Sequence, residues 1–397
     1  MHERPLSGIR VLDLTNVLAG PYCSYQLMLL GAEVVKVEVP GQGDLARSLG
    51  PDPELNSSGL GASFLAQNAG KKSLEIDLKD PDDRARFEDL VRGADVLLEN
   101  FRAGVLERLG FGWPRLRELN PGLVYCAVSG FGQTGPMSQA PAYDQIIQGL
   151  SGMMSVTGTR ETAPLRVGFP VCDTVGGLAA ALHICAALAD RASTGRGTFL
   201  DVSMLEAAVS AMGWAVSNYL VSGVPPEPMG TQNATSAPSG TFEAADGPLN
   251  IAANRQQQFE TLCAILDRRD LLDDPRFVDR EARKLHREEL DDELNAALRR
   301  RAALEWEEVL GAAGVPAARV AEVPEAVELE QLRHRGFFTD LAFPDGSGRT
   351  LRVAGSGVLH DGEPLRPVAP PPLLGEQNAE IEALTARWNG TETAVTS

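Results

Sequence analysis

Short apolar runs and amphipathic stretches alternate through the first two hundred residues. Runs rich in β-branched residues predict strands at residues 9–14, 33–39, 73–78, 95–98 and 123–129. The segments with the apolar spacing of helices are residues 21–30, 80–93 and 173–190. Because strands and helices alternate with short connections, the pattern predicts an α/β fold with a mainly parallel sheet covered by helices on both faces.

The pattern changes near residues 221–230, where VSGVPPEPMG concentrates proline and glycine and indicates a linker. From residue 255 to about 314 the chain is helical and heavily charged, with the amphipathic helices of a smaller domain. Strand-like segments return after residue 330. A proline-rich stretch and an amphipathic helix at residues 376–388 follow.

Composition narrows the class of protein. At 397 residues the chain has room for two or three domains, and 43% hydrophobic with 23% charged residues excludes a disordered chain or a coiled-coil rod. Lys and Arg number 36 against 54 Asp and Glu, a formal net charge of -18. Such an acidic surface repels phosphate backbones, so we expect no nucleic-acid partner.

The longest apolar run and the first residues of the chain indicate where in the cell to expect the protein. Residues 176–188, the longest apolar run, fall short of the roughly 18 residues that a membrane span needs and include His183. We therefore expect a buried helix there and no membrane association. The first residues show no basic stretch followed by an apolar region, so a cytoplasmic location is expected.

Cysteine and histidine usage predicts neither disulfides nor a metal site. The five cysteines form no C-x-x-C pair and lie mostly in apolar runs, so reduced, buried thiols are expected. The five histidines show no ligand spacing among themselves or with cysteine.

Residues 130–135, GFGQTG, match G-x-G-x-x-G after a predicted strand. In a dinucleotide fingerprint the third glycine lies inside a helix, whereas Pro136 follows here at once. An active-site glycine loop or a plain turn is the better interpretation. Neither a P-loop motif nor G-x-S-x-G occurs, and Cys172, without a basic neighbour, is expected to be an inert thiol.

Asp173 stands where an apolar strand is expected to end and a long helix to begin. One interpretation is a helix N-cap. The other is a carboxylate that the helix dipole holds ionised beside Gly176 and Gly177, able to attack an activated acyl group. The residues alone leave both open.

Basic side chains in the N-terminal half cluster beside predicted turns. They suit a phosphorylated ligand or are solvated surface charge, and the pattern leaves both open. These residues are Lys36, Arg47, Lys71, Lys72, Arg102 and Arg108.

An ordered series of blocks over nearly the whole chain resembles the class III coenzyme A transferase family, which includes formyl-CoA and carnitine CoA-transferases and the α-methylacyl-CoA racemases. The blocks are GIRVLDLTNVLAGPYCSYQLMLLGAEVVKVEVPGQGD, NAGKKSLEIDLKDP, DVLLENFRAGVLERLGFG, LVYCAVSGFGQTGP, PAYDQIIQGLSGMMSVTG, VCDTVGGLAAALHICAAL, TGRGTFLDVSMLEA and PPPLLGEQ.

The resemblance implies a Rossmann-like large domain, a smaller α+β domain and an interlocked-ring homodimer. The implied division is a large CoA-binding domain begun by residues 1–200, a linker at 201–229, and the small domain at 230–325. Residues 326–397 would be the return linker and the C-terminal part of the large domain.

The resemblance also implies the site. Asp173 would be the nucleophile, with Asp144 and Tyr143 beside the thioester. No cofactor would be bound permanently and no metal is expected, because acyl-CoA and a small carboxylic acid are the substrates. The implied CoA-binding residues are Val17, Leu18, Ala19, Lys36, Arg47, Lys71, Lys72, Asn100, Phe101, Arg108, Gly130 and Gly132.

Departures from the family pattern narrow the expectation. Tyr143 replaces the histidine of racemases, and Leu18 replaces the glutamine of formyl-CoA transferases. The sequence as a whole most resembles members that use dicarboxylic acids. We therefore expect CoA transfer from succinyl-CoA to a dicarboxylate. Arg166 and Arg47 are the candidates to bind the distal carboxylate of that acid. The alternatives are an α-methylacyl-CoA racemase and a catalytically silent acyl-CoA-binding protein.

Overall fold

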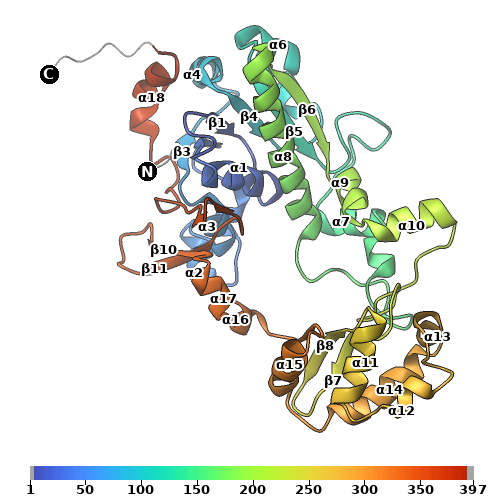
Figure 1. The fold of residues 1–397 in the computed structure, drawn as a ribbon. Coiled ribbons are helices and arrows are strands. Elements are labelled where there is room, and N and C mark those ends of the chain that lie inside the picture. The colour runs from blue at the N-terminus through green and yellow to red at the C-terminus, as the bar shows by residue number, and fades with distance from the viewer. Residues whose placement is uncertain (1–3, 391–397) are drawn as a thin grey trace. The chain divides into compact units, whose positions relative to one another are not determined.

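A six-stranded parallel sheet organises the larger part of the chain, which the computed structural model describes over residues 4–390 (Figure 1). Its strands are β1 (Arg10–Asp13), β2 (Glu33–Glu38), β3 (Lys72–Glu75), β4 (Val96–Glu99), β5 (Val124–Ser129) and β6 (Thr198–Ser203). The order is β3-β2-β1-β4-β5-β6, the doubly wound arrangement of Rossmann folds. The predicted α/β class and parallel sheet are confirmed.

Alternate residues of these strands enter two separate cores. Val11, on β1, packs with α1 and α8 on one face, whereas Leu12 packs with α4 and α6 on the other. The strands therefore read as continuous apolar runs, because both faces are buried. The surrounding helices are α1 (Ala19–Leu29), α2 (Pro53–Ser57), α3 (Ala62–Asn68), α4 (Pro81–Gly93), α5 (Val105–Arg108), α6 (Trp113–Leu119), α7 (Asp144–Leu150), α8 (Val171–Thr194), α9 (Met204–Ala211) and α10 (Trp214–Ser222), with 3-10 turns η1 (Leu45–Ser48) and η2 (Met153–Val156).

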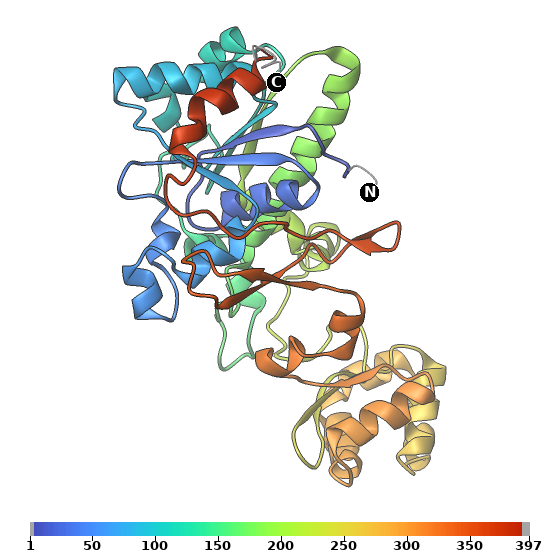
Figure 2. The same ribbon diagram turned by 90° about the vertical axis from the view of Figure 1, so that its left-hand side faces the viewer.

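The C-terminal segment returns to this sheet. Helix α18 (Ile381–Trp388) lies along α4, as the red and light-blue helices of Figure 2 show. Trp388 donates its indole N–H to Glu33 at 2.9 Å, and Ser73 donates its backbone N–H to Gln377 at 2.7 Å. The other elements of this segment are α17 (Glu330–His334), β10 (Phe338–Ala342), β11 (Thr350–Ala354), β12 (Leu359–His360), β13 (Glu363–Pro364) and η3 (Asn378–Glu380).

The second unit has a core of its own, centred on Phe259, Leu294 and Trp306. It is an α+β unit in which helices pack on a three-stranded antiparallel sheet of order β7-β8-β9. Its elements are β7 (Ser239–Glu243), β8 (Pro248–Ala252), β9 (Ala317–Arg319), α11 (Gln256–Ile265), α12 (Asp270–Asp273), α13 (Arg280–Leu285), α14 (Arg287–Leu298), α15 (Ala303–Ala312) and α16 (Val323–Ala326).

The described chain divides into two compact units. The second unit comprises Met154–Leu165 and Pro225–Leu329, and the rest of the described chain forms the first unit. The expected linker 201–229 contains α9 and α10, whose residues belong to the first unit. The excursion at residues 154–165 was not expected, because it has neither a composition shift nor a linker signature.

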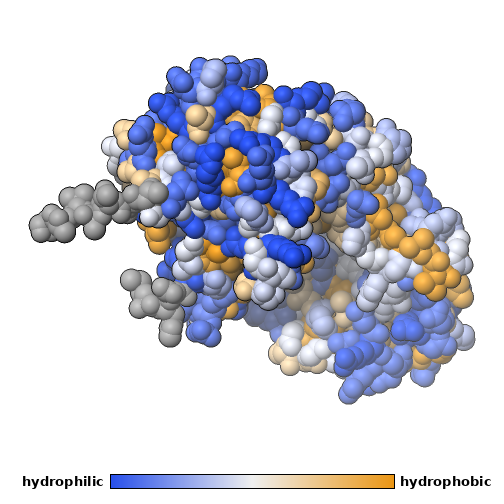
Figure 3. Space-filling view, turned by 90° about the horizontal axis from the view of Figure 1, so that it is seen from above, coloured by the Kyte–Doolittle hydropathy of each residue, from blue (hydrophilic) through white to orange (hydrophobic). Residues whose placement is uncertain are grey.

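Helix α8 is longer than the apolar run suggested. It has 24 residues, and by length and composition it could cross a membrane, with a mean hydropathy of 1.7 over its most apolar window. A core helix of a soluble protein passes the same test. Ala180, Ile184 and Leu188 of this helix pack in the core beneath the sheet. The face in Figure 3 carries hydrophilic and hydrophobic residues interspersed.

Candidate active site

The strand order reverses between β1 and β4, and ligands of doubly wound sheets bind at the carboxyl ends of the strands at such a point. The residues after these two strands are tied together here. Asn16 donates its backbone N–H to Asn100 Oδ1 at 2.8 Å, and Asn100 Nδ2 donates to the Asn16 carbonyl at 2.9 Å. This pairing fixes the floor of a cavity.

The cavity has a volume of about 330 Å³ and lies wholly within the first unit. It brings together eight of the residues implied by the family resemblance. These are Val17, Leu18, Ala19, Asn100, Phe101, Gly130, Tyr143 and Asp173. Tyr143 is 69% exposed and therefore stands at the mouth of the cavity rather than in its interior.

Asp173 lies in the first turn of α8, but it is not the helix cap. Pro170 occupies the N-cap position, and no strand precedes the helix. The cap interpretation is therefore wrong, and so is the expected strand. Residues 165–170 form neither helix nor strand, and the helix begins at Val171, so Asp173 is the third helical residue and lines the cavity.

A second carboxylate, Asp144, contacts the first turn of α8. It is the first residue of α7 and only 6% exposed. Its Oδ1 accepts the backbone N–H of Cys172 at 2.8 Å, and its Oδ2 accepts the Gln148 amide at 2.7 Å. The Arg166 guanidinium lies 3.6 Å from Oδ2. Asp144 thus fixes the backbone of the residue that directly precedes Asp173.

The protonation of Asp173 differs from the expectation. Burial, followed by the negative charge of Asp144, raises the pKa of Asp173 to about 7. Desolvation and a neighbouring like charge thus outweigh the helix dipole that was expected to keep this group ionised. A carboxylate that is costly to ionise is a stronger base and nucleophile once it is ionised, as active sites often require.

A second cavity, of about 390 Å³, adjoins the first and shares Asn16 and Phe101 with it. Its walls come from the ends of β1 and β2 and from the loop after β3. Apolar side chains such as Val39, Ile76 and Leu78 line it, and Lys79 is its one lysine. The two cavities thus lie next to each other at the carboxyl edge of the sheet.

The predicted basic residues divide into two groups. Lys36 and Lys71 are fully buried and ion-paired, with Asp44 at 2.9 Å and with Asp13 at 3.1 Å respectively. Burial lowers the pKa of Lys71 to about 8, against the opposing effect of Asp13. Neither lysine lines these two cavities, because each ammonium group is turned to its buried carboxylate partner.

The other predicted cations are placed differently. Arg47 makes two hydrogen bonds to Glu38, at 2.7 and 2.8 Å, and lies over the Phe64 ring. Lys72 pairs with Glu33 at 2.6 Å. Arg108 is exposed at the end of α5 and lines neither cavity.

Residues 130–135 form a bent loop, not the start of a helix, and Gly130 lines the cavity. This agrees with the interpretation that the motif is not a dinucleotide fingerprint. A Cβ atom on Gly130 would lie 2.3 Å from the Ala142 side chain, so only glycine fits there. Gly132 has a φ of +83°, which favours glycine, but it does not line the cavity. Asp201 accepts the Gln133 backbone N–H with both oxygens at 3.0 Å and fastens the loop to β6.

Four residues of this region were not predicted as site residues. These residues, all of which line the cavities, are Asn16, Asp44, Lys79 and Arg102; Asp44 also accepts the Val17 backbone N–H. Arg102 stood among the basic residues beside turns, which was the available signal. Asn16 and Asp44 gave none, because their importance depends on contacts across 84 and 27 residues of sequence.

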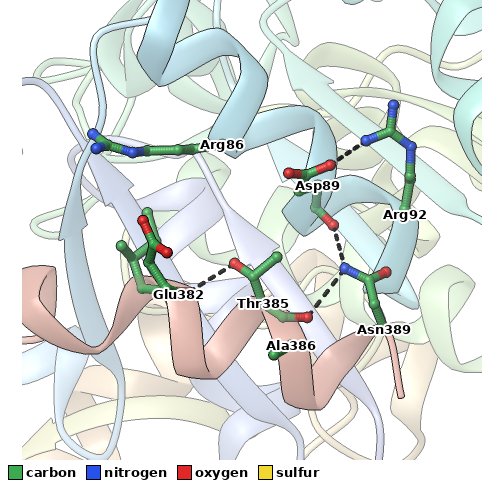
Figure 4. A pocket seen from close by; sticks show the side chains of 8 residues that line it. Arg86, Asp89, Arg92, Glu382, Thr385, Ala386 and Asn389 are labelled. Carbon is green, nitrogen blue, oxygen red and sulfur yellow. Dashed lines mark hydrogen bonds and ion pairs between the residues drawn. The ribbon is translucent and has the colours of Figure 1, made fainter. Parts of the chain in front are cut away.

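A further hollow, of about 540 Å³, lies between α4 and α18 (Figure 4). Asn389 donates to the carbonyls of Asp89 and Thr385 there, at 3.0 and 3.1 Å, and Arg92 pairs with Asp89. These contacts attach α18 to α4, and none of the predicted site residues lines the hollow. Within residues 4–390 no group of three or more His, Cys, Asp or Glu side chains is arranged to hold a metal ion.

Comparison with known proteins places this site in a family. The family model described as CoA-transferase family III matches residues 6–378. The chain is 38% identical over 378 residues to an acetyl-CoA:oxalate CoA-transferase of Acetobacter aceti, covering 95% of each chain. It is 35% identical to the succinyl-CoA:glutarate CoA-transferase of Mus musculus, over 97% of this chain and 87% of the relative.

Solved structures agree with the sequence comparison. A CAIB/BAIF family protein from Brucella suis superposes with a TM-score of 0.85 at 33% identity, covering 97% of this chain and 100% of that one. The expected family, fold and enzyme class are confirmed. The chain belongs to CoA-transferase family III and is an enzyme of the CoA-transferase type.

Proposed function

We propose that this enzyme transfers coenzyme A from an acyl-CoA, foremost succinyl-CoA, to a small dicarboxylic acid, with Asp173 as the nucleophile. The observation that carries the proposal is the position of Asp173, which lines a cavity of about 330 Å³ with a pKa raised to about 7. No other Asp or Glu lines that cavity.

The chemistry needs only this carboxylate and the substrates. An Asp173 oxygen attacks the thioester carbonyl, the C–S bond breaks, and CoA leaves as the thiolate, giving a mixed anhydride. The thiolate then attacks the aspartyl carbonyl and releases the donor acid, which leaves an aspartyl-CoA thioester. The acceptor carboxylate repeats the two steps in reverse order, forming its own acyl-CoA and restoring Asp173.

The two adjacent cavities offer space for CoA. We place the thioester beside Asp173 and the adenosine among Val39, Ile76 and Leu78. Arg102 and Lys79, on the walls of the two cavities, are the cations available to the phosphates. The pantetheine arm would pass Asn16 and Phe101, which both cavities share.

Arg166 supports the choice of a dicarboxylate. Its side chain is 44% exposed, and its guanidinium lies 3.6 Å from Asp144 Oδ2, a long ion pair that a second carboxylate could compete with. Arg47, the other candidate, is 4% exposed and engaged by Glu38. Relatives named for oxalate, glutarate and mesaconate transfer agree with this substrate class.

We also propose that two copies form a homodimer. Helix α10 exposes Trp214, Leu220 and Val221, with 75, 75 and 90% of their surfaces open, and α8 exposes Leu182 at 67%. Large exposed apolar side chains on these helices suit an interface. An interlocked ring, as the family resemblance implies, would bury them permanently.

The test is an exchange assay read by mass spectrometry. Succinyl-CoA and acetyl-CoA are each incubated with glutarate, oxalate, mesaconate, itaconate, acetate and butyrate. We expect new acyl-CoA products with at least one dicarboxylate and weaker ones with the monocarboxylates. Loss of deuterium from C2 of a 2-methylacyl-CoA without any exchange product would instead indicate a racemase.

A further inference from the structure

The segment between β1 and α1 holds a valine in a backbone conformation that valine avoids. Val17 has a φ of +68°, which for a β-branched side chain is a steric outlier. It lines the cavity that contains Asp173. Strain of this kind persists only where surrounding groups impose it, and such residues cluster at functional sites.

Two side chains impose the conformation. Asn100 holds the backbone of Asn16 on both sides, as described above, and Asp44 Oδ1 accepts the Val17 N–H at 2.9 Å. Asp44 comes from the loop after β2. The backbone on the N-terminal side of Val17 is therefore fixed. The backbone on its C-terminal side is fixed as well, because Leu18 is the N-cap of α1 and its carbonyl accepts the Tyr22 N–H at 2.7 Å.

Asp44 is itself fixed by a buried cation. Its Oδ2 lies 2.9 Å from Lys36 Nζ, and both side chains have no exposed surface. Lys36 also donates to the Thr15 carbonyl at 2.6 Å, one residue before the Asn16 pairing. A buried ion pair contributes little to stability compared with an apolar pair of the same volume, so its presence calls for another explanation.

We propose that Asp44, fixed by Lys36, is a positioning residue that holds Val17 in the left-handed conformation and thereby shapes the wall of the cavity that Asp173 also lines. The inference rests on the proposed function only in that the cavity binds acyl-CoA. Without the Asp44 acceptor, Val17 relaxes toward an extended conformation, and the binding-competent cavity becomes a minor state.

Three variants isolate this role. The acceptor-free variant combines Lys36→Met with Asp44→Leu, which replaces the ion pair by apolar groups. The acceptor-retaining variant combines Lys36→Met with Asp44→Asn, whose amide oxygen can still accept the Val17 N–H. The rescue variant adds Val17→Gly to the acceptor-free variant, because glycine adopts a positive φ without steric cost.

We expect kcat/KM with succinyl-CoA and the affinity for CoA, measured by calorimetry, to fall about 5- to 30-fold in the acceptor-free variant. The acceptor-retaining variant should stay within about threefold of the wild type, and the rescue variant should regain most of the loss. Asp44 also caps η1 through the Ala46 N–H, but Val17→Gly cannot restore that bond, so rescue reports on Val17 alone.

Equal losses in the acceptor-free and acceptor-retaining variants, or a loss that Val17→Gly leaves unchanged, would overturn the proposal. If the acceptor-free variant does not fold, the melting transition replaces the rate as the readout. Its recovery on adding Val17→Gly supports the proposal, and the absence of recovery overturns the proposal. A wild-type protein that binds CoA but exchanges no acid refutes the proposed function alone, because CoA affinity still tests the positioning role.

Discussion

Asp144 accepts the backbone N–H of Cys172 at 2.8 Å, which ties one carboxylate to the residue immediately before the other, Asp173. The contact joins the start of α7 to the first turn of α8. It has two effects. It fixes the backbone that carries Asp173, and it keeps a negative charge close enough to raise the pKa of Asp173.

Replacement of the nucleophile should abolish transfer. Asp173→Asn preserves the volume and the helix but removes the attacking oxygen, so kcat should fall at least about a hundredfold. Borohydride or hydroxylamine trapping of the wild type with succinyl-CoA, followed by peptide mapping, should label Asp173. Retention of more than about a tenth of the rate would refute the assignment.

The rate should rise with pH through neutrality. Asp173 attacks only when ionised, so kcat/KM should increase to a plateau with a midpoint near its pKa of about 7. Asp144→Asn removes the neighbouring charge and should move the midpoint to lower pH. The variant also distinguishes Asp173 from Glu99, whose pKa burial raises to about 7 without any contribution from Asp144.

A matched control for this shift is Asp190→Asn, which removes one negative charge from the exposed C-terminal part of the same helix. It should leave the midpoint unchanged. An identical shift in both variants would mean that net charge, rather than the Asp144 contact, sets the profile.

Ionisation of Asp173 should also lower the free energy of unfolding above neutral pH. Its pKa is about 7 when folded against 3.8 for the free group, so between about pH 4 and 7 the folded state binds more protons and stability falls as pH rises. Asp173→Asn lacks this effect. Thermal unfolding should therefore show the variant more stable than the wild type at pH 8, with the difference shrinking toward pH 4.

The two arginines should behave differently. Arg166→Met should raise the KM for dicarboxylate acceptors about tenfold or more and leave acetate almost unchanged, because a charge-assisted hydrogen bond is lost. Arg47→Met should instead lower the melting temperature, because it leaves the buried Glu38 without its partner. Unchanged acceptor preference in Arg166→Met would refute its role.

The dimer is tested by light scattering at micromolar concentration. A mass of two chains is expected across the accessible range, since interlocked chains cannot separate without unfolding. A folded, active monomer would contradict the proposal.

The periodicity of the sequence was sufficient for five of the six strands of the sheet and for the long helices, whereas β6 was not predicted and the strand expected before Asp173 is absent. Strands β1, β2 and β5 and helix α4 lie within a few residues of their predicted bounds, because both faces of the sheet are buried and the strands are continuously apolar. The ordered motifs likewise identified the family and placed Asp173, Asn100 and Tyr143 at one site.

Only the tertiary structure decided which basic side chains are paired with buried carboxylates. Lys36, Lys71 and Arg47 look like ligand-binding cations in sequence, yet each pairs with a buried carboxylate from another loop or strand. The pKa of Asp173 was misjudged for the same reason. Helix position is a local property that sequence reveals, whereas desolvation and the approach of Asp144, 29 positions away in the chain, arise only when the chain folds.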